Sequence, residues 1–199
     1  DTFEQMFKDS LIYRGKRIVN WCTKHQTSLS DLETITETRT DKLYYMKYGP
    51  FTIATSRPET KFGDKYVVMH PDDPRYSQYK DGQEIPVDWL EGKITATVVK
   101  DPIIDMEFGT GVMTITPWHD ATDFDIAERH SLTGVEVIDK NGRLTKAAGK
   151  YEGLKIEEAR EKVIERLKEL GLLVKEEAYE HNVITCYKCA KDLEPLTVP

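Results

Sequence analysis

Hydrophobic and polar positions alternate in several short stretches of the chain, a spacing that predicts β-strands. The clearest stretch covers residues 42–56, which is rich in aromatic and β-branched side chains and is interrupted by Gly49 and Pro50. That interruption is typical of the turn of a β-hairpin. Further strands are predicted for residues 17–21, 67–69, 94–99 and 109–117, the last of which ends at a proline.

Three other segments carry apolar residues at helical spacing. Residues 156–170 repeat an apolar side chain every three or four positions, and Gly171 is the residue at which that helix is expected to end. Residues 119–130 start with acidic side chains and finish with basic ones, which suits the helix dipole. Residues 1–15 have a rougher version of the pattern. Many strands with two or three helices predict a mixed α/β fold, a β-barrel-like domain with a few flanking helices.

Composition excludes several classes of protein. The 199 residues are 39% hydrophobic and 32% charged, which is enough apolar material for a core. No run of about 18 apolar residues occurs and the N-terminus has no signal-peptide pattern, so we expect no membrane partner. Three cysteines, an odd number, favour reduced thiols and a cytoplasmic location. The first residue is not Met, which suggests a fragment excised from a larger protein.

The net negative charge of the chain limits how it can bind nucleic acid. Lys and Arg number 28 against 35 Asp and Glu, a net charge of −7. Non-specific nucleic-acid binding depends on cations that contact phosphates, so the chain is not expected to coat nucleic acid. A site that receives only the end of a nucleic acid stays possible.

Two pairs of metal-ligand residues stand near opposite ends of the sequence. Cys22 and His25 form one pair, and Cys186 and Cys189 form the other. Three thiolates and one imidazole are a recognised ligand set for structural zinc, and this set uses every cysteine in the chain. The alternative is three reduced thiols and a surface histidine. If zinc binds, Cys22 and Cys186 lie within a few Å of each other and the two ends of the domain meet.

Two other segments are dense in functional side chains. The first contains Thr55, Ser56, Arg57 and Thr60, and the second runs from Gly109 to Asp123. In the second, Thr114 and Thr116 share one strand face, and Asp120 and Asp123 share one helix face. A carboxylate at the start of a helix can also serve as its N-cap. For these aspartates a capping role and a catalytic or binding role therefore both stay open.

These segments resemble the connective-peptide insertion of the valyl-tRNA synthetases, which belong to the class I aminoacyl-tRNA synthetase family. Residues 55–60 are similar to the family's Thr-Thr-Arg-Pro-Glu-Thr motif, with Ser56 at the second Thr. Residues 68–73 and 109–130 are similar to the next two motifs, and residues 151–160 to another. The likeness also covers residues 19–33 and 193–196, and therefore nearly the whole chain.

The resemblance implies post-transfer editing, the hydrolysis of the ester in Thr-tRNA(Val). An apolar pocket for valine rejects the isosteric threonine only about 10²-fold, as is known for this enzyme family, so a second and polar pocket is needed. In this interpretation residues 1–199 are a single editing domain of a valine–tRNA ligase, whose ATP-binding half is absent. Residues 1–35 and 180–199 form its neck, with the zinc site. The partners are the acceptor end of tRNA(Val), threonine and the rest of the synthetase in cis. Hydrolysis itself needs no cofactor.

The resemblance also implies roles for individual residues. Asp123 holds the α-ammonium group of the substrate, and Asp120 and Thr116 read the threonine hydroxyl. The residues expected to bind the rest of the substrate or the terminal adenosine are Arg57, Thr55, Ser56, Thr60, Thr114, Trp118 and His119. A positioned water attacks the ester, and no general base is assigned.

The chain departs from the family pattern at two of these positions. Thr114 stands where the family usually carries Lys, so a cation is lost unless Lys61 or Lys65 replaces it. Trp118 stands at a position usually held by a small residue. Two alternative functions follow, namely editing of isoleucyl or leucyl specificity, or a degenerate zinc-stabilised module that positions tRNA without hydrolysis.

Overall fold

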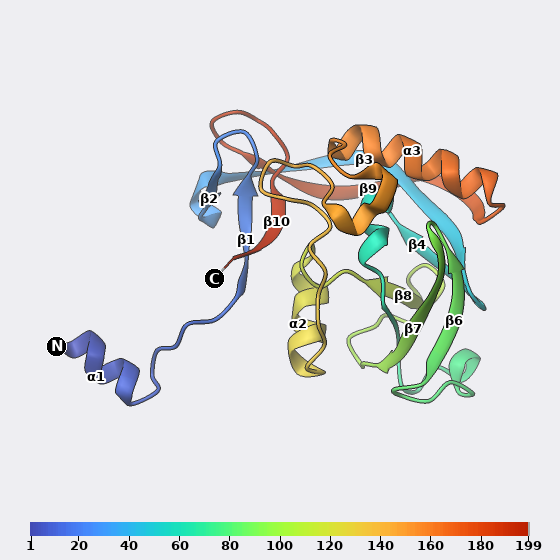
Figure 1. The fold of residues 1–199 in the computed structure, drawn as a ribbon, viewed down its shortest axis with the longest axis horizontal. Helices are drawn as coiled ribbons and strands as arrows, with labels where there is room; N and C mark the ends of the chain where they lie inside the picture. The colour runs from blue at the N-terminus through green and yellow to red at the C-terminus, as the bar shows by residue number, and fades with distance from the viewer. Residues whose placement is uncertain (199) are drawn as a thin grey trace.

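The structure is a computed structural model that describes residues 1–198, and it is built mainly from strands (Figure 1). The strands are β1 (Arg17–Cys22), β2 (Thr27–Leu29), β3 (Thr34–Tyr48), β4 (Phe51–Thr55), β5 (Tyr66–Met69), β6 (Glu84–Trp89), β7 (Gly92–Lys100), β8 (Val112–Ile115), β9 (Leu173–Cys186) and β10 (Glu194–Val198). The α-helices are α1 (Thr2–Lys8), α2 (Ala121–Arg129) and α3 (Ile156–Glu169). Short 3-10 helices are η1 (Asp31–Glu33), η2 (Pro58–Gly63), η3 (Pro74–Tyr76) and η4 (Lys146–Tyr151).

The strands form three sheets with the orders β10-β1-β2, β4-β3-β9 and β6-β7-β5-β8. Among the strands within residues 1–198, β5 and β7 pair in parallel and all the other pairs are antiparallel. The predicted mixed α/β class is therefore confirmed. Among residues 1–198 the three sheets lie around one body without joining into a single closed barrel.

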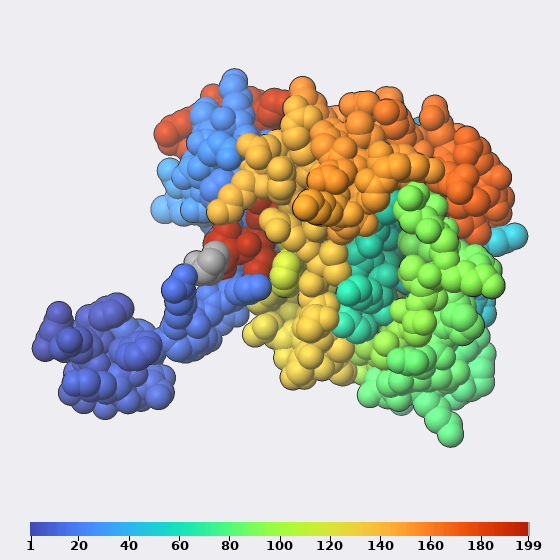
Figure 2. Space-filling model, in the orientation of Figure 1, coloured from blue at the N-terminus to red at the C-terminus, as the bar shows by residue number. Residues whose placement is uncertain are grey.

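The predicted hairpin and helices are present. β3 and β4 pair from Tyr44↔Thr55 to Tyr48↔Phe51, with Gly49 and Pro50 in the turn between them. The predicted helices over 119–130 and 156–170 correspond to α2 and α3. At the N-terminus only residues 2–8 are helical, and they bury no side chain. Figure 2 shows this segment standing apart from the body of the molecule.

The main hydrophobic core lies beneath α3 and holds the backbone of η2 in place. Tyr48 and Trp89 meet edge to face there, with ring centroids 4.7 Å apart. The indole N–H of Trp89 donates to the carbonyl of Lys61 at 2.8 Å, and the Tyr48 hydroxyl donates to the carbonyl of Asp64 at 3.2 Å. Core side chains therefore fix the backbone of η2 and the residue that follows it.

A close approach brings η2 against the end of β8. A Cβ atom on Gly63 would lie 2.8 Å from Cγ2 of Thr116 and 2.8 Å from Cγ2 of Val137. Only a residue without a side chain fits this contact unless its neighbours shift. The two polar segments of the sequence are thus packed together by the fold.

No helix within residues 1–198 is both long and apolar enough to cross a membrane.

Candidate functional site

The first turn of α2 brings three of the predicted site residues together. Asp120 is the N-cap, and its Oδ1 accepts the backbone N–H of Asp123 at 3.0 Å. Asp123 lies inside the turn with its side chain buried, and its Oδ2 accepts the backbone N–H of Thr116 at 2.7 Å. Within the described residues no hydrogen-bond donor reaches the other oxygen of Asp123. Asp120 is exposed, so its cap role leaves its second oxygen open to solvent.

The segment after η2 completes this group. Asp64 accepts hydrogen bonds on Oδ1 from the Thr116 hydroxyl at 3.0 Å and from the Lys61 ammonium at 3.2 Å. Lys61 also donates to the hydroxyl of Thr114 at 3.2 Å. The five residues are all buried, and we refer to them as the carboxylate–threonine cluster: Lys61, Asp64, Thr114, Thr116 and Asp123.

Burial changes the ionisation of both carboxyl groups in this cluster. Burial and, to a lesser extent, the neighbouring charge of Asp120 together raise the pKa of Asp123 to about 7, against the opposing effect of Lys61. Burial also raises the pKa of Asp64, and Lys61 is the largest opposing influence. Buried carboxylates with raised pKa values are typical of functional sites, although ion-pair networks produce them too.

Arg57 belongs to a second, adjoining network of buried charges. Its Nη2 lies 2.7 Å from both carboxylate oxygens of Glu194, and its Nε lies 3.3 Å from Glu59. Its Nη1 donates to the carbonyl of His119 at 3.0 Å. Glu59 is fully buried and also accepts two hydrogen bonds from Arg160, each at 2.9 Å. All three guanidinium nitrogens of Arg57 are therefore engaged by the protein itself.

His119 is also held inside this network. Its Nε2 accepts backbone N–H groups from Val137 at 2.8 Å and Ile138 at 3.2 Å. A ring nitrogen that accepts hydrogen bonds carries no proton, so the proton of the neutral ring is assigned to Nδ1. That atom lies 3.3 Å from Glu194 but is poorly aligned for a hydrogen bond. The ring of His119, which belongs to the loop before α2, thus lies between Glu194 and residues 137–138.

The remaining residues predicted in the first segment make mostly local contacts. The hydroxyl of Thr55 accepts the backbone N–H of Arg57 at 3.0 Å, and the buried Thr60 hydroxyl donates to the Arg57 carbonyl at 2.9 Å. Ser56 lines a groove of about 520 Å³ between this segment and strands β3 and β9, with Arg160 on its wall. None of the other predicted site residues lines that groove.

Trp118 belongs to the loop before α2 and contacts other segments than the cluster does. Its ring is half-buried, and the ammonium of Lys16 lies 4.3 Å from the ring centroid. A Cβ atom on Gly134 would lie 2.2 Å from the indole ring, so a glycine is required for the indole to occupy this position. Within residues 1–198 the Trp118 side chain makes no hydrogen bond to the carboxylate–threonine cluster.

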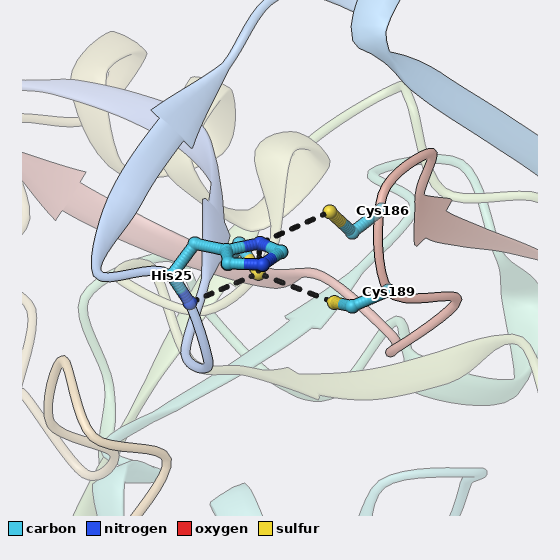
Figure 3. A group of neighbouring side chains, drawn as sticks. His25, Cys186 and Cys189 are labelled. Carbon is cyan, nitrogen blue, oxygen red and sulfur yellow. Dashed lines mark hydrogen bonds between the residues drawn. The ribbon is translucent and has the colours of Figure 1, made fainter.

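The four predicted metal ligands come together at one point. One ligand atom from each residue lies within 4.8 Å of all the others, although 167 residues separate Cys22 from Cys189. The Sγ atoms of those two cysteines are 3.7 Å apart, and Nδ1 of His25 lies 3.4 Å from Cys22 and 3.6 Å from Cys186. Figure 3 shows the imidazole of His25 directed toward the two cysteines of the other pair.

These separations fit a tetrahedral zinc ion. Bonds of about 2.3 Å to sulfur and 2.0 Å to nitrogen require edges of roughly 3.8 Å between sulfurs and 3.6 Å between sulfur and nitrogen. Burial alone would raise the pKa of Cys186, but the backbone N–H groups of Lys188 and Cys189 and the side chain of His25 lower it to about 6. A thiolate at neutral pH is the form that binds metal. The donor set can therefore hold a zinc ion.

Several residues of the two networks received no role in the sequence analysis. They are Glu59, Asp64, Arg160 and Glu194, and each lies inside a segment that resembled a family motif. Presence in a motif was the available signal, but it does not tell which side chains turn inward. Lys61 was considered only as a possible replacement cation, and the structure places it against Thr114.

Comparison with known proteins shows which sequences this chain resembles. Residues 1–181 match the family model described as tRNA synthetases class I (I, L, M and V). The chain is 42% identical over 207 residues to a valine–tRNA ligase of Thermotoga maritima, covering 97% of the chain and 23% of that relative. It is 43% identical over 201 residues to a valine–tRNA ligase of Carboxydothermus hydrogenoformans, covering 98% of the chain and 23% of that relative. The chain thus spans less than a quarter of the length of these relatives.

Proposed function

Because the chain belongs to the class I tRNA synthetases of the I, L, M and V group, we propose that it is the editing domain of a valyl-tRNA synthetase, which hydrolyses the ester of mischarged Thr-tRNA(Val). The observation that carries this proposal is the buried carboxylate of Asp123 beside Asp120 and Thr116 at the start of α2. The similarity to valine–tRNA ligases favours the valyl system over the isoleucyl and leucyl ones.

Asp123 is the group that binds the α-ammonium of the aminoacyl ester. One of its oxygens is fixed by the N–H of Thr116, which leaves the other as an acceptor in a fixed orientation. An ammonium–carboxylate hydrogen bond formed away from water is about twice as strong as a neutral one. Pairing also keeps Asp123 ionised, although burial raises its pKa to about 7.

Thr116 and Asp120 are placed to distinguish threonine from valine. The Thr116 hydroxyl donates its hydrogen bond to Asp64, so the Thr116 oxygen stays available as an acceptor for the hydroxyl of threonine. Asp120 has one oxygen beyond the one that caps α2. Valine offers a methyl group in place of the hydroxyl and would leave such acceptors unpaired, at a cost of roughly 1–3 kcal/mol.

The chemical step uses a water molecule that the site orients. Water adds to the ester carbonyl, and the C–O bond to the terminal ribose then breaks. The products are free threonine and tRNA, whose ribose oxygen takes up a proton. An aminoacyl ester is already reactive, so orientation and hydrogen-bond donors supply most of the catalysis. The Arg57–Glu194 network acts indirectly, by fixing the loop that presents α2.

Zinc fits this function as a structural ion. Cys22, His25, Cys186 and Cys189 would hold it where the segment after β1 meets the end of β9. The ion would link the two ends of the domain, residues 1–35 and 180–199, which we propose form the neck toward the rest of the synthetase. The ATP-dependent attachment of valine, and contact with the body of tRNA(Val), belong to that longer protein in this proposal.

The proposal is tested by hydrolysis of preformed Thr-tRNA(Val) and Val-tRNA(Val). Each is incubated with this chain at high concentration and, in parallel, with a full-length synthetase that carries it. Release of threonine well above the uncatalysed rate, with valine retained, is the expected result. Binding of tRNA without release of threonine by either protein would overturn the proposal and support a module that only positions tRNA.

A further inference from the structure

Lys61 is a lysine buried at the centre of the candidate site. Its side chain is 6% exposed, and its ammonium contacts Asp64 and Thr114 at 3.2 Å each. Lysine is almost never fully buried unless it is paired, because removing an ammonium group from water is costly. The contact with Asp64 explains why the buried Lys61 charge is tolerated. Asp64 is also buried, so its carboxylate in turn depends on Lys61 for a countercharge.

Lys61 connects to Asp123 through two further contacts. The oxygen of Asp64 that accepts from Lys61 also accepts from the Thr116 hydroxyl, and the N–H of Thr116 donates to Asp123. The two polar segments of the sequence are therefore joined by one continuous chain of hydrogen bonds. Its order is Lys61, Asp64, Thr116, Asp123.

The charges in this chain do not balance. When both carboxyl groups are ionised, two buried carboxylates, on Asp64 and Asp123, face one buried ammonium, on Lys61. Lys61 contacts Asp64 and not Asp123, so the uncompensated negative charge falls on Asp123. A cationic group of a ligand would complete the balance at that position.

We propose that Lys61 is a positioning residue of the candidate editing site, whose ammonium neutralises Asp64 and leaves Asp123 as the carboxylate that receives the α-ammonium of the substrate. This inference rests on the proposed function. The Lys61 side chain enters the cluster from η2. Its hydrogen-bond partner Thr114 belongs to β8.

The ionisation of Asp123 gives this role a measurable consequence. The groups that face Asp123 are Lys61 from η2, Asp64 after it, Asp120 at the N-cap and the N–H of Thr116 from the end of β8. Of the charged ones, only Lys61 lowers the pKa of Asp123. Without that cation a larger fraction of the carboxyl is protonated at neutral pH, and its pairing with an ammonium group is weakened.

The contact between Lys61 and Thr114 also allows the charge to be supplied from the opposite side. In the double variant Lys61→Met with Thr114→Lys, the ammonium would enter the same buried space from β8 instead of η2. A role in packing alone would not be restored by this exchange, since the shapes of both side chains change. A role of the charge would be restored.

The test is a carboxyl ¹³C NMR titration of Asp123 in this chain, assigned with Asp123→Asn. Lys61→Gln keeps hydrogen-bond donors but removes the charge, and it is expected to raise the proton affinity of Asp123 roughly tenfold. The double variant is expected to return it to the wild-type value. Lys65→Met removes an exposed lysine four residues away and is the matched control, with no change expected.

The titration is paired with the pH dependence of Thr-tRNA(Val) hydrolysis, in which Lys61→Gln should move the acid limb to higher pH. An unshifted Asp123 titration in Lys61→Gln overturns the role of Lys61, whether or not the wild type hydrolyses the ester. If Lys61→Gln does not fold, the double variant decides, and an Asp123 titration that differs from wild type overturns the role. A shifted titration in a chain that never hydrolyses Thr-tRNA(Val) overturns the proposed function alone.

Discussion

Both carboxylate oxygens of Glu194 lie 2.7 Å from Nη2 of Arg57, a residue 137 positions earlier in the chain. This pair joins β10 to the segment that leads into η2. Burial would raise the pKa of Glu194, but the charge of Arg57 and the contact with His119 lower it below its usual range. Strand β10 and the candidate site are therefore linked by an ion pair in which Glu194 is buried and Arg57 is partly buried.

Replacing Glu194 with Gln should destabilise the fold strongly. The variant keeps the shape of the side chain but leaves the Arg57 charge without its main partner, and breaking a buried pair in this way costs about 3 kcal/mol. The free energy of unfolding in urea measures the effect. Glu158→Gln removes an exposed partner of Lys162 and should change it by less than about 0.5 kcal/mol. Equal effects of the two substitutions would contradict the role given to Glu194.

Asp123 should make the stability of the fold depend on pH. The folded carboxyl keeps its proton up to about pH 7, whereas the ordinary value is 3.8. Between these values the unfolded state binds fewer protons, so the free energy of unfolding falls as pH rises. Asp123→Asn removes this titration, and its stability relative to wild type should rise between pH 4 and 7, by no more than about 4 kcal/mol.

Urea unfolding of both proteins at half-unit steps of pH measures that difference. The raised pKa of Asp64 contributes in the same direction in both proteins, so it largely cancels in the comparison. A difference that stays constant from pH 4 to 7 would show that Asp123 is not buried as described.

The cysteine–histidine group should bind one zinc ion per chain. Elemental analysis of protein prepared with zinc gives the stoichiometry, and Cys189→Ser is expected to lower the metal affinity at least tenfold. A chelator should lower the melting temperature of the wild type, because the ion stabilises the state that binds it. His181→Gln is the matched control, since that histidine pairs with Asp41 far from the group. A metal affinity equal in the wild type and Cys189→Ser would exclude the site.

The close approach of Gly63 to β8 should make this position intolerant of a side chain. In Gly63→Ala the new methyl group would meet Thr116 and Val137 at 2.8 Å, and overpacking of this kind costs about 1–3 kcal/mol. Gly15→Ala adds the same methyl group on an exposed segment and should change stability little. Amide chemical shifts report whether Thr116 moves. A stable Gly63→Ala variant with an undisturbed Thr116 amide would argue against the contact.

The sequence predicted the elements whose signals are local. The Gly49–Pro50 hairpin, a carboxylate cap at the start of α2 and the periodicity of α3 all depend on residues close together in the chain, and each has its counterpart in the structure. The long pairing of β3 with β9 was not predicted. Few residues of these two strands are buried, and their register is set by partners more than 120 residues apart.

The residues of the candidate site also divide into those placed by local sequence and those placed by contacts with distant segments. Asp120, Asp123 and Thr116 could be placed together because a strand end and a helix start adjoin in sequence. Arg57 and His119 were expected to face a substrate, and their engagement by Glu194 depends on a strand near the other end of the chain. Lys61 is visible as a lysine in the sequence, but only the packing of η2 against β8 puts its ammonium on Thr114.

The most direct test of the account compares two aspartates of α2 in the hydrolysis of Thr-tRNA(Val). Asp123 is buried beside Thr116, while Asp125 lies two residues further along the same helix and is exposed. If Asp123 binds the α-ammonium of the substrate, Asp123→Asn reduces threonine release about 10²-fold through loss of a charge-assisted hydrogen bond. Asp125→Asn does not reduce it. Threonine release by Asp123→Asn at the wild-type rate would contradict this role of Asp123.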